Sequence, residues 1–281
     1  QTVLNSAYYN QLFWEGSVTS LEQQAPAAAG GGVAGNGDDS VMEMRLRFLP
    51  EYVAEFKQVF GTEWPRINDA WRAIAAYERT VISDAKKVPF DRYAMGDKKA
   101  LNASQQKGMT LFNGKAGCIQ CHNGPLASNQ KFYATGVPVH PNFKEDPIGQ
   151  VTHRWELYQK GVPEQYYRTG NDDHGLFYIT KNPKDIGKWR VPSLRELKYT
   201  APYMHNGMLA TLADVVEFYD MGGGAAQNKT PLLKPLSLSA QEKKDLVAFL
   251  EALSMDEPLI HDDPKLPGDY QPLPAPVMAI K

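Results

Sequence analysis

The sequence predicts a mostly α-helical protein with little sheet, on the strength of three observations. Apolar residues recur at three- and four-residue spacing over 64–83, the pattern of an amphipathic helix. Residues 239–242 read Ser-Ala-Gln-Glu, a capping box that opens a second helix through about Leu253. Residues 123–192 are rich in glycine, proline and asparagine with few periodic runs, so we expect long loops there and a small hairpin near 176–180.

The amino-terminal third predicts an irregular start followed by helices. Residues 1–24 hold several aromatic side chains without a clear period. Residues 25–37 are nearly all alanine and glycine, which have little side chain to pack, so we expect a mobile surface loop. Asp39 and Ser40 are candidate caps for the next helix, and another helix is expected over 50–61, from a proline to a glycine.

The remaining elements follow from similar signals. Residues 88–97 contain proline, aspartate and glycine and read as a link, and a short helix is expected over 104–112. Thr211 can cap a helix over 212–219. The apolar stripe of the helix that begins near residue 239 suits docking onto the helix of 104–112.

Composition excludes several classes of partner. The chain has 281 residues and a formal net charge of -2, which gives no basic surface for nucleic acid. No apolar run approaches the length of a membrane span. No signal peptide is visible at Gln1. The motif described next leads us to expect that a signal has been removed and that the protein lies in the bacterial periplasm.

The most informative motif is Cys118-Ile119-Gln120-Cys121-His122, which contains the only two cysteines of the chain. Two thiols at this spacing followed by an imidazole are the signature of covalent c-type haem attachment, with His122 as proximal iron ligand. A thioredoxin-like redox pair would need a βαβ context that is missing here. A zinc site would need a second pair of ligands, and no other cysteine exists. A disulfide across two intervening residues would be strained.

Several longer strings go beyond the haem motif, and in this order they resemble the bacterial di-haem cytochrome c peroxidase and MauG family. The resemblance covers almost the whole chain. The strings are Leu12-Phe13-Trp14-Glu15-Gly16, Leu21-Glu22-Gln23-Gln24-Ala25, Ala76-Tyr77-Glu78-Arg79-Thr80, Pro89-Phe90-Asp91-Arg92-Tyr93, Arg190-Val191-Pro192-Ser193-Leu194-Arg195 and Thr200-Ala201-Pro202-Tyr203-Met204-His205-Asn206-Gly207.

The resemblance implies a domain plan with one large departure. Family members carry two CxxCH motifs, whereas this sequence holds only the one that matches the second. A partner chain or a missing segment therefore supplies the first haem, or the protein works with one. We expect a helical segment over 1–87, a cytochrome c-type haem domain over 88–260, and a proline-rich tail over 261–281.

The second axial ligand of the haem is the most consequential choice. In the family's peroxidases this haem is held by His and Met, and in the MauG branch a tyrosine replaces the methionine. Aligning outward from the His205 string places Tyr219 at that position. Met204, Met208 and Met221 are the alternatives, with Tyr219 then a core aromatic. A phenolate stabilises ferric iron and a thioether favours ferrous iron, so Tyr219 predicts a low potential.

Other residues are expected around the cofactor. Met204 and His205 belong to a string that resembles the family's haem surroundings, and His205 is expected near the haem edge rather than on the iron. Arg190, Pro192 and Arg195 belong to a second such string. The two arginines are candidate partners of the haem propionates, because a guanidinium fork matches a carboxylate. A surface salt bridge is the alternative for Arg195.

The resemblance also names catalytic residues. Trp14 matches the tryptophan between the two haems, where an indole can relay electrons, although core packing is the alternative. Gln24 matches a glutamine of the peroxidatic pocket. The loop that normally supplies an acid–base glutamate is replaced by the Ala/Gly run, and no glutamate occurs between Gln24 and Met42. Glu43 is the nearest substitute.

Two functions follow as hypotheses. The first is a peroxidase or MauG-like oxidoreductase that reduces hydrogen peroxide and oxidises a small redox protein or a protein substrate. The second is an electron-transfer subunit without peroxidase activity, which the missing haem and missing glutamate favour. The resemblance also implies calcium, bound in part by backbone oxygens of Thr200 and Pro202. A second haem-bearing chain is a further candidate partner.

Overall fold

The computed structural model describes residues 1–170 and 172–260, and these residues are mostly helical, as the sequence predicts. Short strands β1 and β2 pair antiparallel, with Phe132 opposite Arg190 and Tyr133 opposite Trp189. In chain order the elements are η1 Ser6–Tyr8, α1 Leu21–Gly30, α2 Asp39–Arg47, α3 Pro50–Phe60, α4 Ile67–Glu78, α5 Pro89–Ala94, α6 Ala103–Asn113, η2 Cys118–Gln120, β1 Phe132–Tyr133, α7 Pro141–Glu145, α8 Pro147–Gln159, α9 Glu164–Thr169, α10 Phe177–Thr180, η3 Pro183–Asp185, β2 Trp189–Arg190, η4 Leu197–Tyr199, α11 Leu212–Asp220 and α12 Ala240–Glu251.

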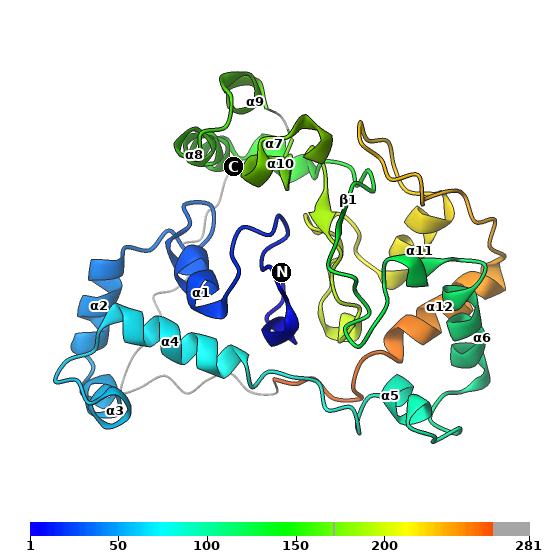
Figure 1. Ribbon diagram of the computed structural model, residues 1–281, viewed down its shortest axis with the longest axis horizontal. Coiled ribbons are helices and arrows are strands. Elements are labelled where there is room, and N and C mark those ends of the chain that lie inside the picture. The colour runs from blue at the N-terminus through cyan, green and yellow to red at the C-terminus, as the bar shows by residue number, and fades with distance from the viewer. Residues whose placement is uncertain (171, 261–281) are drawn as a thin grey trace, which may run out of the picture.

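The helices form three groups, which Figure 1 shows around the first residues of the chain. Helices α1–α4 make up one side of the molecule, and α6, α11 and α12 make up the opposite side. Helices α7–α10 lie together along a third edge, next to β1. Segments far apart in sequence therefore surround the middle of the molecule, where the site described below is built.

The contact between α6 and α12 forms the main core and confirms the predicted docking. A Cβ atom on Gly108 of α6 would lie 1.9 Å from the carbonyl oxygen of Asp245, so the two helices approach this closely only because residue 108 is glycine. The rings of Phe112 and Phe249 lie 5.2 Å apart across this contact. Burying a side chain of this size stabilises the fold by about 1.5–3 kcal/mol. The other buried members are Ala116, Leu212, Val216, Leu238, Leu246, Leu250 and Leu253.

The predicted mobile loop over 25–37 is wrong in its first half, which belongs to α1. Ser20 caps this helix by accepting a hydrogen bond from the backbone N–H of Gln23 at 3.3 Å. The alanines that follow have the highest helix propensity of all residues, so they continue the helix to Gly30. Beyond it, the N–H of Gly32 donates to Oε1 of Glu156 on α8 at 2.7 Å, which ties this segment to the third helix group.

Other helix boundaries differ from the expected ones by a few residues. The long helix predicted over 64–83 is shorter, because α4 begins at Ile67 and ends at Glu78. Asp38, rather than Asp39 or Ser40, caps α2 through the N–H of Val41 at 3.0 Å. The predicted link over 88–97 contains α5, whose proline stands at the start of the helix where its missing N–H is tolerated.

The largest error concerns residues 123–192, where loops and a hairpin were expected. The described part of this segment holds four α-helices, α7 to α10, and α10 occupies the place of the expected hairpin. Asp146 caps α8 by accepting from the N–H of Gly149 at 2.8 Å, and Pro147 stands at the first helical position. Four apolar or aromatic side chains recur at helical spacing over 148–158, a signal that was present in the sequence.

A buried polar network joins the amino-terminal segment to the core of the protein. The Oγ of Ser83 donates to Oε1 of Glu196 at 2.7 Å, and the N–H of Met255 donates to Oε2 at 3.1 Å. Asn5 in turn donates to the Ser83 hydroxyl at 2.9 Å. Glu196 is fully buried, so this network fixes three chain segments against one another. The expected tail over 261–281 lies outside the described residues.

Candidate haem site

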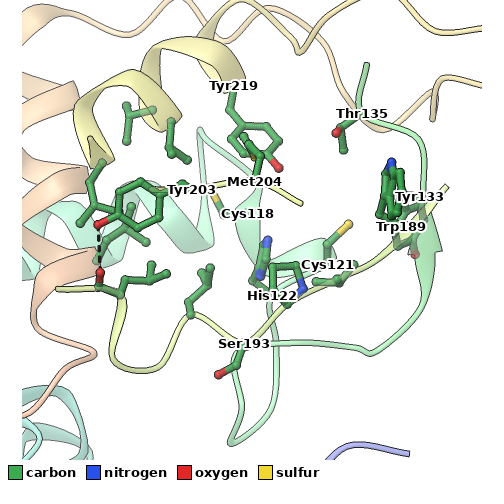
Figure 2. Close-up of a pocket in the computed structure, with 18 of the residues that line it drawn as sticks. Cys118, Cys121, His122, Tyr133, Thr135, Trp189, Ser193, Tyr203, Met204 and Tyr219 are labelled. Atoms are coloured by element: carbon green, nitrogen blue, oxygen red, sulfur yellow. Dashed lines mark hydrogen bonds between the residues drawn. The ribbon is translucent and has the colours of Figure 1, made fainter. Parts of the chain in front are cut away.

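A cavity of about 590 Å³ lies between α6, α11 and the β1–β2 pair, a volume typical of cofactor sites. Leucine, valine and aromatic side chains make up much of its wall. Figure 2 shows Cys118, Cys121 and His122 together in this wall. The structure thus places the haem-attachment signature at the edge of a largely apolar cavity.

A single turn presents both sulfurs and the imidazole. Gly117 has φ of 62°, a conformation that glycine adopts without strain, and it leads into the turn η2. The N–H groups of Cys121 and His122 both donate to the carbonyl of Cys118, at 3.2 and 2.9 Å. Burial raises the pKa of the Cys118 thiol to about 11, whereas a reactive redox pair needs a lowered pKa. This environment does not favour the thioredoxin-like alternative.

His122 is oriented as a metal ligand would be. Its Nδ1 lies 2.9 Å from the carbonyl oxygen of Ala127, so Nδ1 carries the proton and Nε2 keeps its lone pair. Burial lowers the pKa of the ring to about 4, with the carbonyls of Ala127 and Pro192 partly opposing that shift. The imidazole is therefore neutral at physiological pH, the form that binds iron.

Tyr219 on α11 lines the same cavity, and Figure 2 shows its ring above His122 in that view. Within the described structure its hydroxyl has no hydrogen-bond partner, and its ring contacts that of Phe218 at 5.2 Å. Burial first, and then the nearby Cys118 and Cys121, raise the pKa of its phenol. A hydroxyl that faces a cavity without a partner among the described residues is free to bind a ligand there.

The structure reduces the number of methionines that could replace Tyr219 as axial ligand. Met221 is 61% exposed and lies outside the cavity wall, and Met208 is not part of that wall either. Met204 does line the cavity, with φ of 71°. Tyr219 and Met204 are therefore the two candidates that the geometry retains, and which of them binds iron stays a prediction.

Arg190 is a buried guanidinium without a carboxylate. Its side chain is only 1% exposed, yet no described Asp or Glu lies within ion-pair distance. Its guanidinium stacks on the ring of Tyr9 at 3.8 Å, and Nε donates to the carbonyl of Phe13 at 3.3 Å. The side chain lines the cavity. Because buried charges are normally paired, this one calls for an anion from the cavity.

Arg195 also reaches the cavity but already has a partner. It forms two hydrogen bonds with the carboxylate of Asp91, at 2.6 and 2.8 Å, and Nε donates to the carbonyl of Pro125 at 2.8 Å. The structure therefore shows an ion pair for this residue, but the pair is largely buried and is not the surface salt bridge that was the alternative. Pro192 lines the cavity between the two arginines, as its place in the string implies.

Trp14 lines the cavity and is bound to the strand that carries Arg190. The backbone N–H of Arg190 donates to the carbonyl of Trp14 at 2.8 Å. The preceding Phe13 adopts φ of 63°, in the left-handed region that bulky residues rarely occupy. This turn directs Trp14 to the cavity, and its role as a relay stays a prediction.

His205 stacks on Trp189, a residue that sequence reasoning missed. Their ring centroids lie 3.8 Å apart at 13°, and both rings line the cavity. Burial lowers the pKa of His205 to about 4, so the ring is neutral. Trp189 stands directly before the string that begins at Arg190, and an aromatic residue next to that string was the signal in the sequence that could have indicated it.

Gln24 and Glu43 lie outside the wall of this cavity. The Oε1 atom of Gln24 is buried without a hydrogen-bond partner. Glu43 is engaged in the fold, because it pairs with Arg47 and its Oε2 accepts from the N–H of Ile67 at 2.9 Å, at the start of α4. Catalytic roles for both residues stay predictions.

The expected calcium ligands lie beside the cavity. Thr200 and Pro202 are part of its wall, and the peptide bond between Ala201 and Pro202 is cis. In the part of the chain that the structure describes, no group of three or more His, Cys, Asp or Glu could hold a metal ion. A site that uses backbone oxygens at Thr200 and Pro202 stays a prediction.

Taken together, the residues around the cavity fit a c-type haem. The sulfurs of Cys118 and Cys121 and the neutral imidazole of His122 lie at one edge of the cavity. The phenol of Tyr219 also lines the cavity, and the buried guanidinium of Arg190 has no carboxylate partner among the described residues. A haem supplies an iron for the first set and propionates for the guanidinium. The apolar remainder of the wall suits the porphyrin face.

Comparison with known proteins agrees with this assignment. The family profile described as di-haem cytochrome c peroxidase matches residues 1–99. The cytochrome-c peroxidase IdrP1 of Pseudomonas sp. (strain SCT) is 72% identical over 277 residues, which cover 99% of this chain and 73% of that protein. The methylamine utilization protein MauG of Methylorubrum extorquens is 32% identical, over 94% of this chain and 66% of its own length.

A solved structure shares the fold as well. A MauG-like protein associated with microbial copper homeostasis superimposes with a TM-score of 0.73 at 28% identity, covering 92% of this chain and 76% of the other. None of the described helices is both long and apolar enough to cross a membrane.

Proposed function

The chain belongs to the di-haem cytochrome c peroxidase family, and on this premise we propose that it binds one haem c through Cys118, Cys121 and His122. It is accordingly a haem oxidoreductase of the peroxidase kind. Its proposed reaction is the reduction of hydrogen peroxide, or the use of peroxide to oxidise a protein substrate. The observation that carries this proposal is the conjunction of paired sulfurs, a bare imidazole nitrogen and an unpaired guanidinium in one cavity.

When bound, a c-type haem supplies an iron centre that accepts and passes on single electrons. The chain's own residues set the conditions for that chemistry. Ala127 holds His122 in the tautomer whose Nε2 can bind iron. Tyr219 is the proposed second ligand, because it lines the cavity and its hydroxyl has no hydrogen-bond partner among the described residues, and Met204 is the alternative. A hard phenolate oxygen stabilises ferric iron.

Arg190 is the proposed partner of a haem propionate. Its guanidinium is buried, lines the cavity and has carbonyl oxygens and the ring of Tyr9 as its contacts among the described residues. A charge-assisted hydrogen bond to a carboxylate would satisfy it. Arg195, held by Asp91, has less need of the propionate.

Trp14 is the proposed relay to a second haem, supplied by another segment or another chain. It lines this cavity, and a hydrogen bond from the N–H of Arg190 fixes its backbone there. Gln24 and Glu43 are proposed for the peroxidatic side, where the family uses a glutamine and a glutamate. The hydrogen bonds of Glu43 to Arg47 and Ile67 give it a fold role as well.

We also propose the setting in which the protein works. A small redox protein that donates electrons, or a protein substrate, is the expected partner. Attachment of haem c after export places the protein in the bacterial periplasm. Thr200 and Pro202 are the proposed contribution to a calcium site.

The experiment that tests the function is rapid mixing of the holoprotein with hydrogen peroxide, with and without a reduced small cytochrome. We expect a fast change in the haem absorption spectrum, followed by oxidation of the donor. A haem-to-protein ratio on the same sample shows whether a second haem is present. A haem spectrum that does not respond, together with no oxidised donor, would leave the chain as an electron-transfer subunit without peroxidase activity.

A further inference from the structure

We propose that a chain of aromatic side chains carries single electrons between an exposed Trp–Tyr pair on α8 and the haem cavity. The inference rests on the proposed function in one respect, since peroxide-oxidised haem is the acceptor that draws electrons inward. The route runs through the third helix group, which Figure 1 shows at the edge of the molecule next to β1. Its members are His205, Trp189, His174, Tyr166, Tyr167, Tyr158 and Trp155.

The inner end of the route is the stacked pair of Trp189 and His205, both in the cavity wall. Gly175 connects this pair to the helix group. A Cβ on Gly175 would lie 3.1 Å from two atoms of the Trp189 indole, so the backbone here rests directly on the ring. The N–H of Leu176 donates to the carbonyl of Lys188 at 3.0 Å, which fixes this approach. The next residue back along the chain, His174, carries the next ring of the route.

The middle of the route is a group of rings packed around one buried cluster. The centroids of His174 and Tyr166 lie 5.7 Å apart, within the range of edge-to-face contact. Tyr166 also packs on Phe177 at 4.5 Å, which is 1% exposed. Tyr167 follows Tyr166 directly in sequence, and both pack against the same buried cluster.

The outer end reaches solvent. The ring of Tyr167 contacts that of Tyr158 at 5.8 Å, and Tyr158 stacks on Trp155 at 5.5 Å and 26°. Trp155 and Tyr158 lie three residues apart on α8, which places them on one face of the helix. They are 57% and 56% exposed, so large aromatic surfaces stand open to a partner. A donor at this face would have contact with the first ring of the route.

The chemistry uses the oxidisable rings. Electron tunnelling weakens steeply with distance, so several short steps between indole and phenol rings are faster than one long step. The oxidised haem takes one electron from Trp189, each indole or phenol farther out then reduces the oxidised ring inside it, and the donor finally reduces Trp155. The imidazoles of His174 and His205 are not themselves oxidised and only fill the space between these rings. A tyrosine releases its phenolic proton on oxidation and recovers a proton on reduction, so the route has no net proton change.

The decisive test separates electron transfer from packing and needs no peroxide. A ruthenium polypyridyl complex is attached to holoprotein carrying Val151→Cys, an exposed position one turn before Trp155 on α8. A flash with an added quencher makes ruthenium(III), which takes one electron from the reduced haem. The rate of haem oxidation is followed by its absorption in the parent, in Trp155→Phe and in Trp189→Phe.

Each phenylalanine variant keeps a ring for packing but removes a site that can be oxidised. We expect each to slow haem oxidation by at least about tenfold, equivalent to about 1.4 kcal/mol on the barrier. Trp155→Tyr and Trp189→Tyr should restore most of the rate. The matched control is Trp64→Phe, because Trp64 is 51% exposed and lies outside the route, and it should leave the rate unchanged.

The inference is overturned if both phenylalanine variants slow the reaction by less than that factor while haem content and spectrum are normal. If Trp189→Phe fails to retain haem, Trp155→Phe alone decides, because its side chain is largely exposed. A second measurement treats the unlabelled holoprotein with peroxide and no donor. Mass spectrometry should then find oxidation at Trp155 and not at Trp64. No spectral response to peroxide would contradict the proposed function, while the flash experiment would still decide on the route.

Discussion

Arg190 and Glu196 stand close together in sequence and are both almost fully buried, but their surroundings differ completely. Glu196 lies in the seam between chain segments, where Ser83 and the N–H of Met255 each give one of its oxygens a hydrogen bond. Arg190 lies in the cavity wall, where it meets carbonyl oxygens and the face of a tyrosine but no described carboxylate. One buried charge is satisfied within the chain and the other is not.

The difference teaches how a structural charge is told from a ligand-binding one. Burying a charge is costly unless it is paired, so a fully bonded group such as Glu196 has its role inside the fold. A buried group that lacks a partner indicates a ligand. Tyr219 and the bare Nε2 of His122 show the same incompleteness around the same cavity. The haem assignment rests on these three polar groups, which lack partners and lie around one cavity.

The largest effect is expected from removing Glu196, the buried charge whose hydrogen bonds come from within the chain. Glu196→Ala removes two hydrogen bonds to a carboxylate and leaves the Met255 N–H buried without an acceptor, so we expect a loss of about 3 kcal/mol in unfolding free energy. Urea unfolding of the holoprotein measures it, with the exposed Glu51→Ala as control. An equal and small effect of both substitutions would show that the seam contributes little.

The role of Arg190, the buried charge without a carboxylate partner, is tested by the reduction potential of the haem. Arg190→Met removes a positive charge from the proposed propionate site, and because that charge disfavours the ferric state, the potential of the haem should fall. Arg190→Lys keeps the charge and should recover most of the potential. A redox titration followed by absorption gives both values. A potential that is the same in Arg190→Met as in the parent would contradict a propionate partner at this position.

The axial ligand sharpens the comparison further. Tyr219→Phe removes the phenol oxygen and leaves the ring, so we expect a changed ferric spectrum and a raised potential, because a hard anionic donor stabilises ferric iron. Met204→Leu should leave both properties nearly unchanged. The reverse pattern would identify Met204 as the ligand and Tyr219 as a wall residue.

Asp173 is intermediate between the fully hydrogen-bonded Glu196 and the unpaired Arg190, because one hydrogen bond partly offsets the cost of its burial. We expect its effect on stability to be the smallest. Burial raises the pKa of its carboxyl to about 6, opposed by a hydrogen bond from the N–H of Gly175 at 3.0 Å. A folded-state pKa above the unfolded value means that ionisation disfavours the fold, so stability should fall as pH rises from about 4 through 6. Asp173→Asn should remove that pH dependence, as measured by urea unfolding across the range. A parent protein without such a decline would contradict a raised pKa.

Features encoded within a few residues could be predicted from the sequence. The helix cap at Thr211, the capping box at Ser239 and the proline-to-glycine helix over 50–61 all have local hydrogen bonding or backbone geometry as their cause. The haem-attachment motif is likewise a short run of consecutive residues. The docking of α12 on α6 followed from one apolar stripe, and Gly108 explains why the two helices can approach so closely.

Features that depend on distant partners could not be predicted. Nothing local distinguishes Glu196 from a surface glutamate, because its donors come from residues 83 and 255. The unpaired state of Arg190 likewise depends on which carboxylates are absent from its surroundings. Helix α8 is different, because its apolar residues over 148–158 do show helical spacing in the sequence. The glycine- and proline-rich composition of the wider segment favoured loops and outweighed that local signal.

The most direct test of covalent haem in this cavity is the mass of the proteolytic peptide of the purified natural protein that contains Cys118 and Cys121. We predict the mass of that peptide plus one haem, with neither thiol able to react with a thiol reagent. A peptide of unmodified mass with two reactive thiols would contradict covalent haem in this cavity.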